Sequence, residues 1–359
     1  MTTILGIEST AHTFGIGVVK DGSVLANVRE MYTTEEGGII PMESAKHHAN
    51  VAGDVYVRAL KESGISEENI DAIAFSQGPG LAPCLIEGMK FAKELAGRLG
   101  KPIIPVNHCI AHLEVGRLTC AHQGCTPKNK KFLQGAKDPV MLYVSGANTQ
   151  VIAYSSGKYR IFGETLDVGV GNFIDNFARF LGLGFPGGPK IEKLAEQGTP
   201  QAYPEKSSSK IFTRGKKYIE LPYKVKGMDI ALSGILTNLK QKVESKDYKK
   251  EDLAFSMQET VFAMLVETAE RALAHTGKKE LLLGGGVACN SRLQEMCKIM
   301  CKERGAKFFV PERSLLVDNA AMIAFLGEII FNKGIFEKDI DKIDILPRQR
   351  TDEVEVSWR

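Results

Sequence analysis

The sequence predicts an α/β protein in which one α/β unit is duplicated, with a cleft between the two halves. The chain has 359 residues, which is enough for roughly two packed units. Apolar runs of strand length alternate along it with runs of helical spacing. Both halves begin with an apolar strand, a turn of small residues bearing a polar pair and a second strand, as in "ILGIESTAHTFGIGVV" and "VMLYVSGANTQVIAYS".

The first half is predicted to open with a hairpin over residues 3–28, in which "KDGS" forms the turn between two β-branched apolar runs. Helices should follow at 43–64 and 81–100, each ending at a glycine. Strands are predicted after each of them, at 71–80 and 101–108. The last of these strands delivers His108 at its end.

The second half is predicted to begin near residue 138 with another hairpin around a glycine-containing turn. Two helices, a strand–glycine loop–helix unit, a strand and a final helix should follow, at 171–182, 252–276, 280–300, 307–312 and 319–331. Two polar, basic segments broken by Pro or Gly are expected to be surface loops inserted in the fold, 118–137 and 199–218.

Composition narrows the protein class only coarsely. No apolar run of about 20 residues could span a bilayer, and "MTTILGIEST" leads directly into an apolar strand rather than a signal peptide. We therefore expect a cytoplasmic protein whose seven cysteines are reduced thiols. The formal charge of +3 neither demands nor excludes nucleic acid, and basic runs such as Lys206–Lys217 and Lys246–Lys250 are usually solvated faces.

Two glycine-containing turns are candidates for contact with an anionic ligand. Gly284, Gly285 and Gly286 follow an apolar strand and precede a helix, so backbone and helix N-terminus could approach a phosphate. "SGANT" (145–149) joins two strands, and its amides could hold phosphate oxygens. An ordinary tight turn remains the alternative in both cases.

A third candidate lies between residues 163 and 195. Asp167, Asp175 and Glu192 accompany Gly187 and Gly188 of "PGGP", a combination that suits ribose hydroxyls or a charged ligand tail. A capped helix followed by a rigid loop would explain the same residues.

His108 and His112 of "VNHCIAHLEVGR" share a helix face at i and i+4, where two imidazoles can hold one metal ion. Cys109 stands where a zincin protease has its glutamate, so proteolysis is poorly supported. A third ligand must come from elsewhere in the chain, and Asp318 and Tyr143 are candidates. Two histidines on an ordinary helix are the alternative.

Other histidines and cysteines carry weaker signals. His47 and His48 are adjacent, so they point to different helix faces and cannot readily share a metal. Cys120, His122 and Cys125 supply only three zinc ligands, at unusual spacing. Neither group predicts a site by itself.

Taken together, the motifs closely resemble those of the universal tRNA threonylcarbamoyladenosine-modifying family. This family includes bacterial TsaD and the archaeal and eukaryotic catalytic subunit of KEOPS, once described as an O-sialoglycoprotein endopeptidase, and the resemblance is to the archaeal type. It covers nearly the whole chain apart from the two inserts. The motifs occur in the family's order: "GIESTA", "IPMESAKHHA", "FSQGPGLAPCL", "VNHCIAHLE", "YVSGANTQV", "GETLDVGVGNFIDNFAR", "PGGPKIE", "KGMDIALSG", "GGGVACNSRL" and "VDNAAMIA".

The resemblance implies the duplicated actin-like, Hsp70-like and sugar-kinase ATPase (ASKHA) fold. It divides the chain into an N-terminal domain, 1–138, on which 320–359 packs back, and a C-terminal domain, 139–319. It implies one Fe²⁺ or Zn²⁺ ion held by His108, His112, Tyr143 and Asp318. The implied contacts to an adenine nucleotide are Tyr143, Val144, Ser145, Gly146, Ala147, Asp175, Gly188, Glu192 and Asn290. Further candidates at the same site are Glu8, His12, Asn148, Gly284, Gly285 and Gly286.

The activity implied is transfer of the threonylcarbamoyl group from threonylcarbamoyl-AMP to the exocyclic amine of the adenosine next to the anticodon, in tRNAs reading ANN codons, with release of AMP. The implied partners are tRNA, KEOPS-type subunits including a small RIO-like kinase and a dimerising subunit, and an upstream threonylcarbamoyl-AMP synthase. A glycine loop and helix N-termini suit the leaving phosphate. The sequence identifies no catalytic base.

Some residues depart from the family pattern, and other functions share the fold. His12 stands near where bacterial members have an acid, and Met42 stands where many relatives have arginine. A plain ATPase or sugar kinase would give the histidine helix no role, and it usually has Asp where this chain has Glu8. A non-catalytic nucleotide-binding scaffold is a further alternative, and a metalloprotease is disfavoured.

Overall fold

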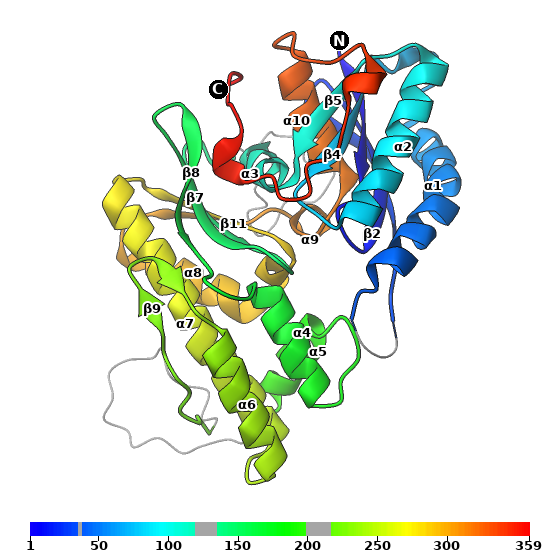
Figure 1. The fold of residues 1–359 in the computed structure, drawn as a ribbon. Helices are drawn as coiled ribbons and strands as arrows, with labels where there is room; N and C mark the ends of the chain where they lie inside the picture. Colours follow the sequence, from blue (N-terminus) through cyan, green and yellow to red (C-terminus); the bar gives the residue numbers. More distant parts are fainter. Residues whose placement is uncertain (35–37, 119–134, 199–216) are drawn as a thin grey trace.

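A computed structural model describes residues 1–34, 38–118, 135–198 and 217–359. It shows two lobes, each built on a five-stranded mixed sheet (Figure 1). The strands of the first sheet are β1 (Thr3–Glu8), β2 (Thr13–Lys20), β3 (Ser23–Met31), β4 (Ala72–Gly78) and β5 (Ile103–Asn107). Those of the second are β6 (Val140–Val144), β7 (Thr149–Ser155), β8 (Lys158–Glu164), β11 (Glu280–Gly284) and β12 (Lys307–Phe309). A short ribbon pairs β9 (Val225–Lys226) with β10 (Asp229–Ile230).

The two sheets have the same topology, which confirms the predicted duplication. Their orders are β3-β2-β1-β4-β5 and β8-β7-β6-β11-β12. In each sheet the first three strands form an antiparallel meander, and the first strand also pairs in parallel with the fourth. The turn after β1 and the turn after β6 therefore occupy equivalent positions.

Ten α-helices connect and cover the sheets within the described ranges. They are α1 (Pro41–Ser63), α2 (Ala82–Leu99), α3 (His108–Leu118), α4 (Val170–Phe180), α5 (Gly188–Glu196), α6 (Ser233–Ser245), α7 (Lys250–Thr276), α8 (Ser291–Glu303), α9 (Arg313–Leu316) and α10 (Ala320–Phe331). Short 3₁₀ turns lie at Glu67–Asn69, Gly286–Cys289, Ile340–Lys342 and Thr351–Glu353. In Figure 1, α1 and α2 cover the outer face of the first sheet.

The helices predicted from helical spacing are present at nearly the predicted bounds, and α1 and α2 are followed by Gly64 and Gly100 in the left-handed conformation. The predicted 3–28 hairpin is instead the three-stranded meander β1–β3. Helices α5 and α6 were not predicted. Each buries only two residues fully (Ile191 and Ala195, Ile235 and Leu239), and the partly buried Leu194 and Leu236 pack beside them on the second core.

Helix α10 packs closely on the first sheet because the sheet presents glycines there. A Cβ on Gly6 would lie 2.3 Å from the Ala324 nitrogen, and one on Gly17 would lie 2.5 Å from the Ala321 nitrogen. The helix is apolar on nearly all sides and buried along most of its length. It shares one hydrophobic core with α3 and with residues of both sheets, such as Ile4 and Leu282. Helix α3 thus lies between the two lobes (Figure 1).

The segment after α10 runs across the first lobe and reaches the second (Figure 1). Leu346 donates its amide to the Gln77 carbonyl (2.8 Å), at the end of β4. Further along, the Arg350 guanidinium pairs with Glu164 of β8 (3.2 Å). The chain end therefore contacts both lobes.

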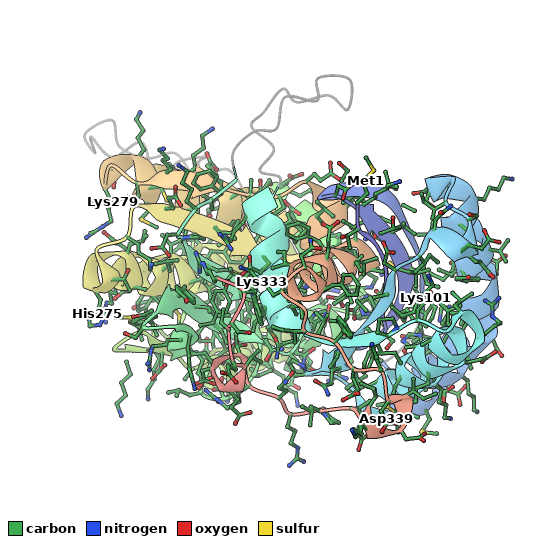
Figure 2. All side chains as sticks on the ribbon, turned by 90° about the horizontal axis from the view of Figure 1, so that it is seen from above. Met1, Lys101, His275, Lys279, Lys333 and Asp339 are labelled. Atoms are coloured by element: carbon green, nitrogen blue, oxygen red, sulfur yellow. The ribbon has the colours of Figure 1, made fainter. Side chains whose placement is uncertain are left out.

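Figure 2, seen from above, places His275 and Lys279 at one end of the molecule and Lys101 and Asp339 toward the other. Lys333, just after α10, lies between them. Among the described residues no helix is both long and apolar enough to cross a bilayer.

Candidate metal centre

The histidine pair is positioned by the junction of β5 and α3. β5 ends at Asn107, whose side-chain oxygen accepts a hydrogen bond from the Ile110 amide (3.1 Å) and so caps the helix that begins at His108. One helical turn later His112 lies on the same face, and the two imidazole centroids are 4.8 Å apart. Both side chains are buried.

Asp318 completes a three-residue group from the other half of the sequence. Its Oδ1 lies 3.4 Å from His108 Nε2 and 3.5 Å from His112 Nε2. One ligand atom from each of the three residues lies within 4.8 Å of the other two. Two imidazoles and a carboxylate form a donor set that suits both zinc and ferrous iron.

The loop before α10 fixes the position of Asp318. The next residue, Asn319, is fully buried; its side chain accepts from the Met322 amide (3.0 Å) and donates to the Val317 carbonyl (2.8 Å). Arg29 of β3 donates to the Ser314 carbonyl (3.2 Å). These hydrogen bonds therefore hold the backbone that carries Asp318, just before the start of α10.

Tyr143, near the end of β6, adds a fourth candidate donor. Its ring centroid lies 5.2 Å from that of His112, and the side chain is fully buried. Within the described residues, its hydroxyl and both ring nitrogens of His112 have no hydrogen-bond partner. Buried polar groups are rarely left unpaired, so these orphaned atoms fit a site that is completed by a metal ion.

Burial and neighbouring charges shift the pKa values of His108, His112 and Asp318 in different directions. Burial alone would lower the pKa of His108, but Glu8 and Asp318 outweigh burial and hold it well above its usual range. Burial lowers the pKa of His112. For Asp318, burial is outweighed by the two histidines, which hold its pKa well below the ordinary value. The arrangement thus concentrates negative charge beside two buried imidazoles.

Glu8, the last residue of β1, lies directly behind His108. Its Oε2 is 2.9 Å from His108 Nδ1, and the glutamate is fully buried. Its Oε1 accepts hydrogen bonds from the Thr10 amide (2.7 Å) and the Thr10 hydroxyl. Glu8 therefore joins the turn after β1 to the helix that carries the histidines.

The other end of α3 carries a separate polar cluster. Glu114 is buried and accepts from the hydroxyl of Tyr159, from Arg117 Nη1 (2.6 Å) and from Trp358 Nε1 (3.4 Å). Both of its oxygens are engaged. The carboxylate closest in sequence to the histidine pair thus serves a structural contact between α3, β8 and the chain end.

The predicted phosphate-binding turn after β6 lies against the start of α4. The amides of Gly171 and Asn172 donate to the carbonyls of Ser145 (3.0 Å) and Gly146 (2.9 Å). A Cβ on Gly169 would lie 2.3 Å from the Ala147 carbonyl oxygen, so the glycines permit this close approach. The turn itself is closed by a 2.8 Å bond from the Ser145 amide to the Asn148 carbonyl.

Gly285 of the glycine loop meets the same turn. It has a φ of +91°, and a Cβ there would lie 2.4 Å from the Val144 carbonyl oxygen. Its neighbour Gly284 lies close to Met141 and near His112. A Cβ on Gly284 would lie 2.1 Å from the Met141 methyl carbon and 3.9 Å from the His112 Cβ. Gly286 faces open space. The structure therefore brings the two glycine-containing turns together, beside the histidine group.

The remaining predicted ligand-binding residues form two smaller groups. Asp175 accepts from the Gly187 amide (2.7 Å), beside Gly188 at the start of α5, and burial raises its pKa. Glu192 accepts from the Ser291 amide (2.7 Å) at the start of α8. Asn290 caps α8 by accepting from the amides of Arg292 and Leu293; its side-chain nitrogen donates to Gln258 (2.7 Å).

Comparison with known proteins identifies the family. The family model described as TsaD, tRNA N6-adenosine threonylcarbamoyltransferase, matches residues 23–325. The chain belongs to this family. A tRNA N6-adenosine threonylcarbamoyltransferase of Thermococcus kodakarensis is 53% identical over 99% of both chains, and one of Danio rerio is 47% identical over 100% of both.

Some TsaD relatives are longer than this chain. A probable bifunctional tRNA threonylcarbamoyladenosine biosynthesis protein of Methanosarcina mazei is 48% identical over 99% of this chain, which covers 60% of that protein. Among solved structures, Thermococcus kodakarensis HypF is similar in fold, with a TM-score of 0.58 and 15% identity. The match covers 93% of this chain and 48% of the HypF chain. This likeness supports the two-lobed fold alone.

Several residues that shape this TsaD-family site were not predicted from the sequence. Asp167 accepts from the amides of Leu232 (2.9 Å) and Ser233 (2.9 Å) at the start of α6, which agrees with the helix-cap alternative, and its contact with a ribose stays a prediction. Arg29 and Asn319 were not predicted, although Asn before "AAMIA" is a recognisable N-cap signal. His12 packs its ring edge-on against Phe185, with 5.6 Å between centroids.

Some predictions lie outside the described residues: most of the inserts 118–137 and 199–218, the Cys120, His122 and Cys125 group, and nearly all of Lys206–Lys217. Lys250 of the second basic run is hydrogen-bonded within the protein: its amine donates to the Leu181 carbonyl (2.9 Å).

Proposed function

We propose that the chain is a tRNA N6-adenosine threonylcarbamoyltransferase whose reaction centre is the group formed by His108, His112 and Asp318, with Tyr143 as a fourth ligand. The observation that carries the proposal is the convergence of these buried side chains, from both halves of a TsaD-family sequence, with Tyr143 and His112 otherwise unpaired. One Fe²⁺ or Zn²⁺ per chain fits this donor set. When bound, such an ion would polarise a carbonyl oxygen as a Lewis acid.

The donor substrate is threonylcarbamoyl-AMP, and its nucleotide lies on the turn after β6. Residues Val144 to Ala147 and Asn148 form this turn, and the N-terminus of α4, an 11-residue helix, abuts it. The first amides of α4 already donate to Thr149, Ser145 and Gly146, so this helix favours a phosphate through its dipole rather than through free amides. Gly284, Gly285 and Gly286 lie beside the same turn, while Asp175, Gly188, Glu192 and Asn290 provide the ribose and base side of the site.

In the reaction the exocyclic amine of the tRNA adenosine attacks the carbamoyl carbonyl carbon. A C–N bond forms, the bond between that carbon and the phosphate oxygen breaks, and AMP leaves with the electron pair. The amine loses a proton, for which no residue is assigned as base. The role of the chain is to hold the donor and to stabilise the charge on the leaving phosphate through backbone amides of the glycine-containing turns and the dipole of α4.

The acceptor is the adenosine next to the anticodon in tRNAs that read ANN codons. The chain acts in the cytoplasm with KEOPS-type subunits, including a small RIO-like kinase and a dimerising subunit, downstream of a threonylcarbamoyl-AMP synthase. The bifunctional Methanosarcina relative, in which a matching region is part of a longer biosynthesis protein, supports a neighbouring activity in the same pathway. Two domains, 1–138 with 320–359 and 139–319, meet at the proposed centre.

A reconstituted assay tests this function. It contains tRNA, threonine, bicarbonate, ATP, the adenylate-forming enzyme and the partner subunits, and threonylcarbamoyladenosine is measured by mass spectrometry of digested tRNA. The wild-type chain should form the modified nucleoside, and His108→Ala and His112→Ala should lower the rate at least about 100-fold. Full activity in both variants would refute the role of the metal group, and no modification by the wild-type system would refute the function.

A further inference from the structure

Glu8 is buried where it touches both the proposed metal group and the turn after β1. It is fully buried at the end of β1, and its two oxygens face different partners. Oε1 accepts from the Thr10 amide at 2.7 Å and from the Thr10 hydroxyl. Oε2 lies 2.9 Å from His108 Nδ1.

These contacts fix which nitrogen of His108 faces Asp318. A carboxylate accepts hydrogen bonds and donates none, so the Nδ1 beside Oε2 carries the proton. The opposite nitrogen, Nε2, is the one that lies 3.4 Å from Asp318 Oδ1. When a metal ion displaces the proton that Nε2 directs at Asp318, the lone pair of Nε2 points into the group formed by His108, His112 and Asp318.

We propose that Glu8 is a positioning residue that sets the orientation and tautomer of His108 so that Nε2 binds the metal ion. Carboxylates that accept from the second nitrogen of a metal-bound histidine commonly have this effect, and losing them typically weakens metal binding about 10- to 100-fold. His112 has no such carboxylate among the described residues: its Nε2 faces Asp318 at 3.5 Å, and its Nδ1 has no hydrogen-bond partner. Glu8 thus acts on one of the two histidines only.

The geometry makes Glu8→Gln a sharp test. The Thr10 amide can only donate, so the glutamine oxygen must take the Oε1 position. The glutamine NH₂ group then faces His108 Nδ1 and donates to it, which removes the proton from Nδ1 and places one on Nε2. That change opposes metal binding through Nε2, although the side chain keeps its size.

The inference rests on the proposed metal site, so binding to wild type is measured first. Metal-free protein is titrated with Zn²⁺ against a chelator, alongside His108→Ala and His112→Ala. If wild type does not bind, or if both alanine variants bind as well as wild type, the proposed site fails. If wild type alone binds, the Glu8 variants test the inference separately.

Glu8→Gln should bind Zn²⁺ about 10- to 100-fold more weakly than wild type. Glu8→Asp keeps the charge but draws the carboxylate back from His108, so it should also bind more weakly. Glu328→Gln is the matched control: Glu328 is a buried glutamate on α10 that accepts from the Gly22 amide (2.8 Å), and its variant should bind as wild type does. Wild-type affinity in Glu8→Gln, or in Glu8→Asp, would overturn the inference.

A spectroscopic measurement on wild type decides the matter even if the Glu8 variants do not fold. In Zn²⁺-loaded protein labelled with ¹⁵N-histidine, His108 should show a protonated Nδ1 and a metal-bound Nε2, assigned by comparison with His112→Ala. A metal-bound Nδ1 at His108 would contradict the positioning role.

Discussion

The two ends of α3 carry buried polar clusters that differ in how fully their atoms are paired. At the C-terminal end, Glu114 accepts from three side chains, and both of its oxygens are used. At the N-terminal end, the hydroxyl of Tyr143 and His112, whose Nε2 lies 3.5 Å from Asp318, make no hydrogen bond within the described residues. A saturated cluster stabilises the fold by itself, whereas an unsaturated one costs stability unless a ligand completes it. The C-terminal cluster is saturated at its carboxylate, with Arg117 Nε left unpaired, whereas the N-terminal cluster leaves a tyrosine hydroxyl and an imidazole beside a carboxylate without hydrogen bonds.

The largest expected effect breaks the saturated cluster. Glu114→Ala leaves the Arg117 guanidinium and the Tyr159 hydroxyl without their acceptor, so it should lower the free energy of unfolding by about 3–5 kcal/mol. Denaturant unfolding of the metal-free protein measures this loss. Glu114→Gln keeps the shape and should cost less. A change below about 0.5 kcal/mol for Glu114→Ala would show that the cluster is not structural.

A third buried histidine shows how burial, without neighbouring carboxylates, changes the pKa of an imidazole. His48 on α1 is fully buried like His108, but burial, reinforced by His47, lowers its pKa to about 4. The unfolded histidine titrates near pH 6.5, so the unfolded chain binds more protons between these values. Stability from this residue should fall as the pH drops from 6.5 to 4, by about 3 kcal/mol in total.

This pH dependence has a matched pair of variants. His48→Gln should flatten the fall in the free energy of unfolding between pH 6.5 and 4, whereas His275→Gln, at an exposed position on α7, should leave it unchanged. If His48→Gln showed the same slope as wild type, burial of His48 would not be the cause.

The comparison is sharpest when one hydroxyl is removed from each cluster. Tyr159→Phe takes a donor from Glu114 and should lower the free energy of unfolding by about 1–3 kcal/mol. Tyr143→Phe removes a hydroxyl that has no partner, so the metal-free protein should gain about 1 kcal/mol while its affinity for Zn²⁺ falls. Calorimetry of both metal-free variants tests the opposite signs. Equal destabilisation by the two changes would remove the distinction between the clusters.

The smallest effect concerns the contact between Glu114 and the chain end. Trp358→Phe preserves the packing of the ring but removes the 3.4 Å bond from its nitrogen to Glu114. The expected cost is about 0.5–1 kcal/mol, because Glu114 keeps its two other donors. Thermal unfolding should detect this as a small shift, and a loss as large as that of Glu114→Ala would show that the tail governs the whole cluster.

Sequence patterns were sufficient for those parts of the fold and site that depend on local spacing. The repeated strand–turn–strand unit predicted the duplicated sheets, and the i, i+4 spacing of His108 and His112 put them on one face of α3. Contacts between distant segments were beyond this kind of inference. Glu8 is 100 residues from His108 in sequence, and no periodicity links the two.

Local hydrogen bonding also changed the interpretation of polar residues near the glycine loop. Asn290 and Glu192 both bond to backbone amides at the start of α8, which a sequence alone does not distinguish from ligand binding. Asp167 likewise bonds to the start of α6. Their roles as nucleotide contacts stay predictions, because an acid or amide near a glycine turn suits a helix cap and a ligand equally well.

The most direct test of the central claim is the metal content of the purified chain after reconstitution with Fe²⁺ or Zn²⁺ and removal of excess ion. Elemental analysis should find one ion per wild-type chain and per Glu114→Gln chain, and almost none in folded His112→Ala or Asp318→Asn. Retention of one tightly bound ion in both His112→Ala and Asp318→Asn would contradict the account.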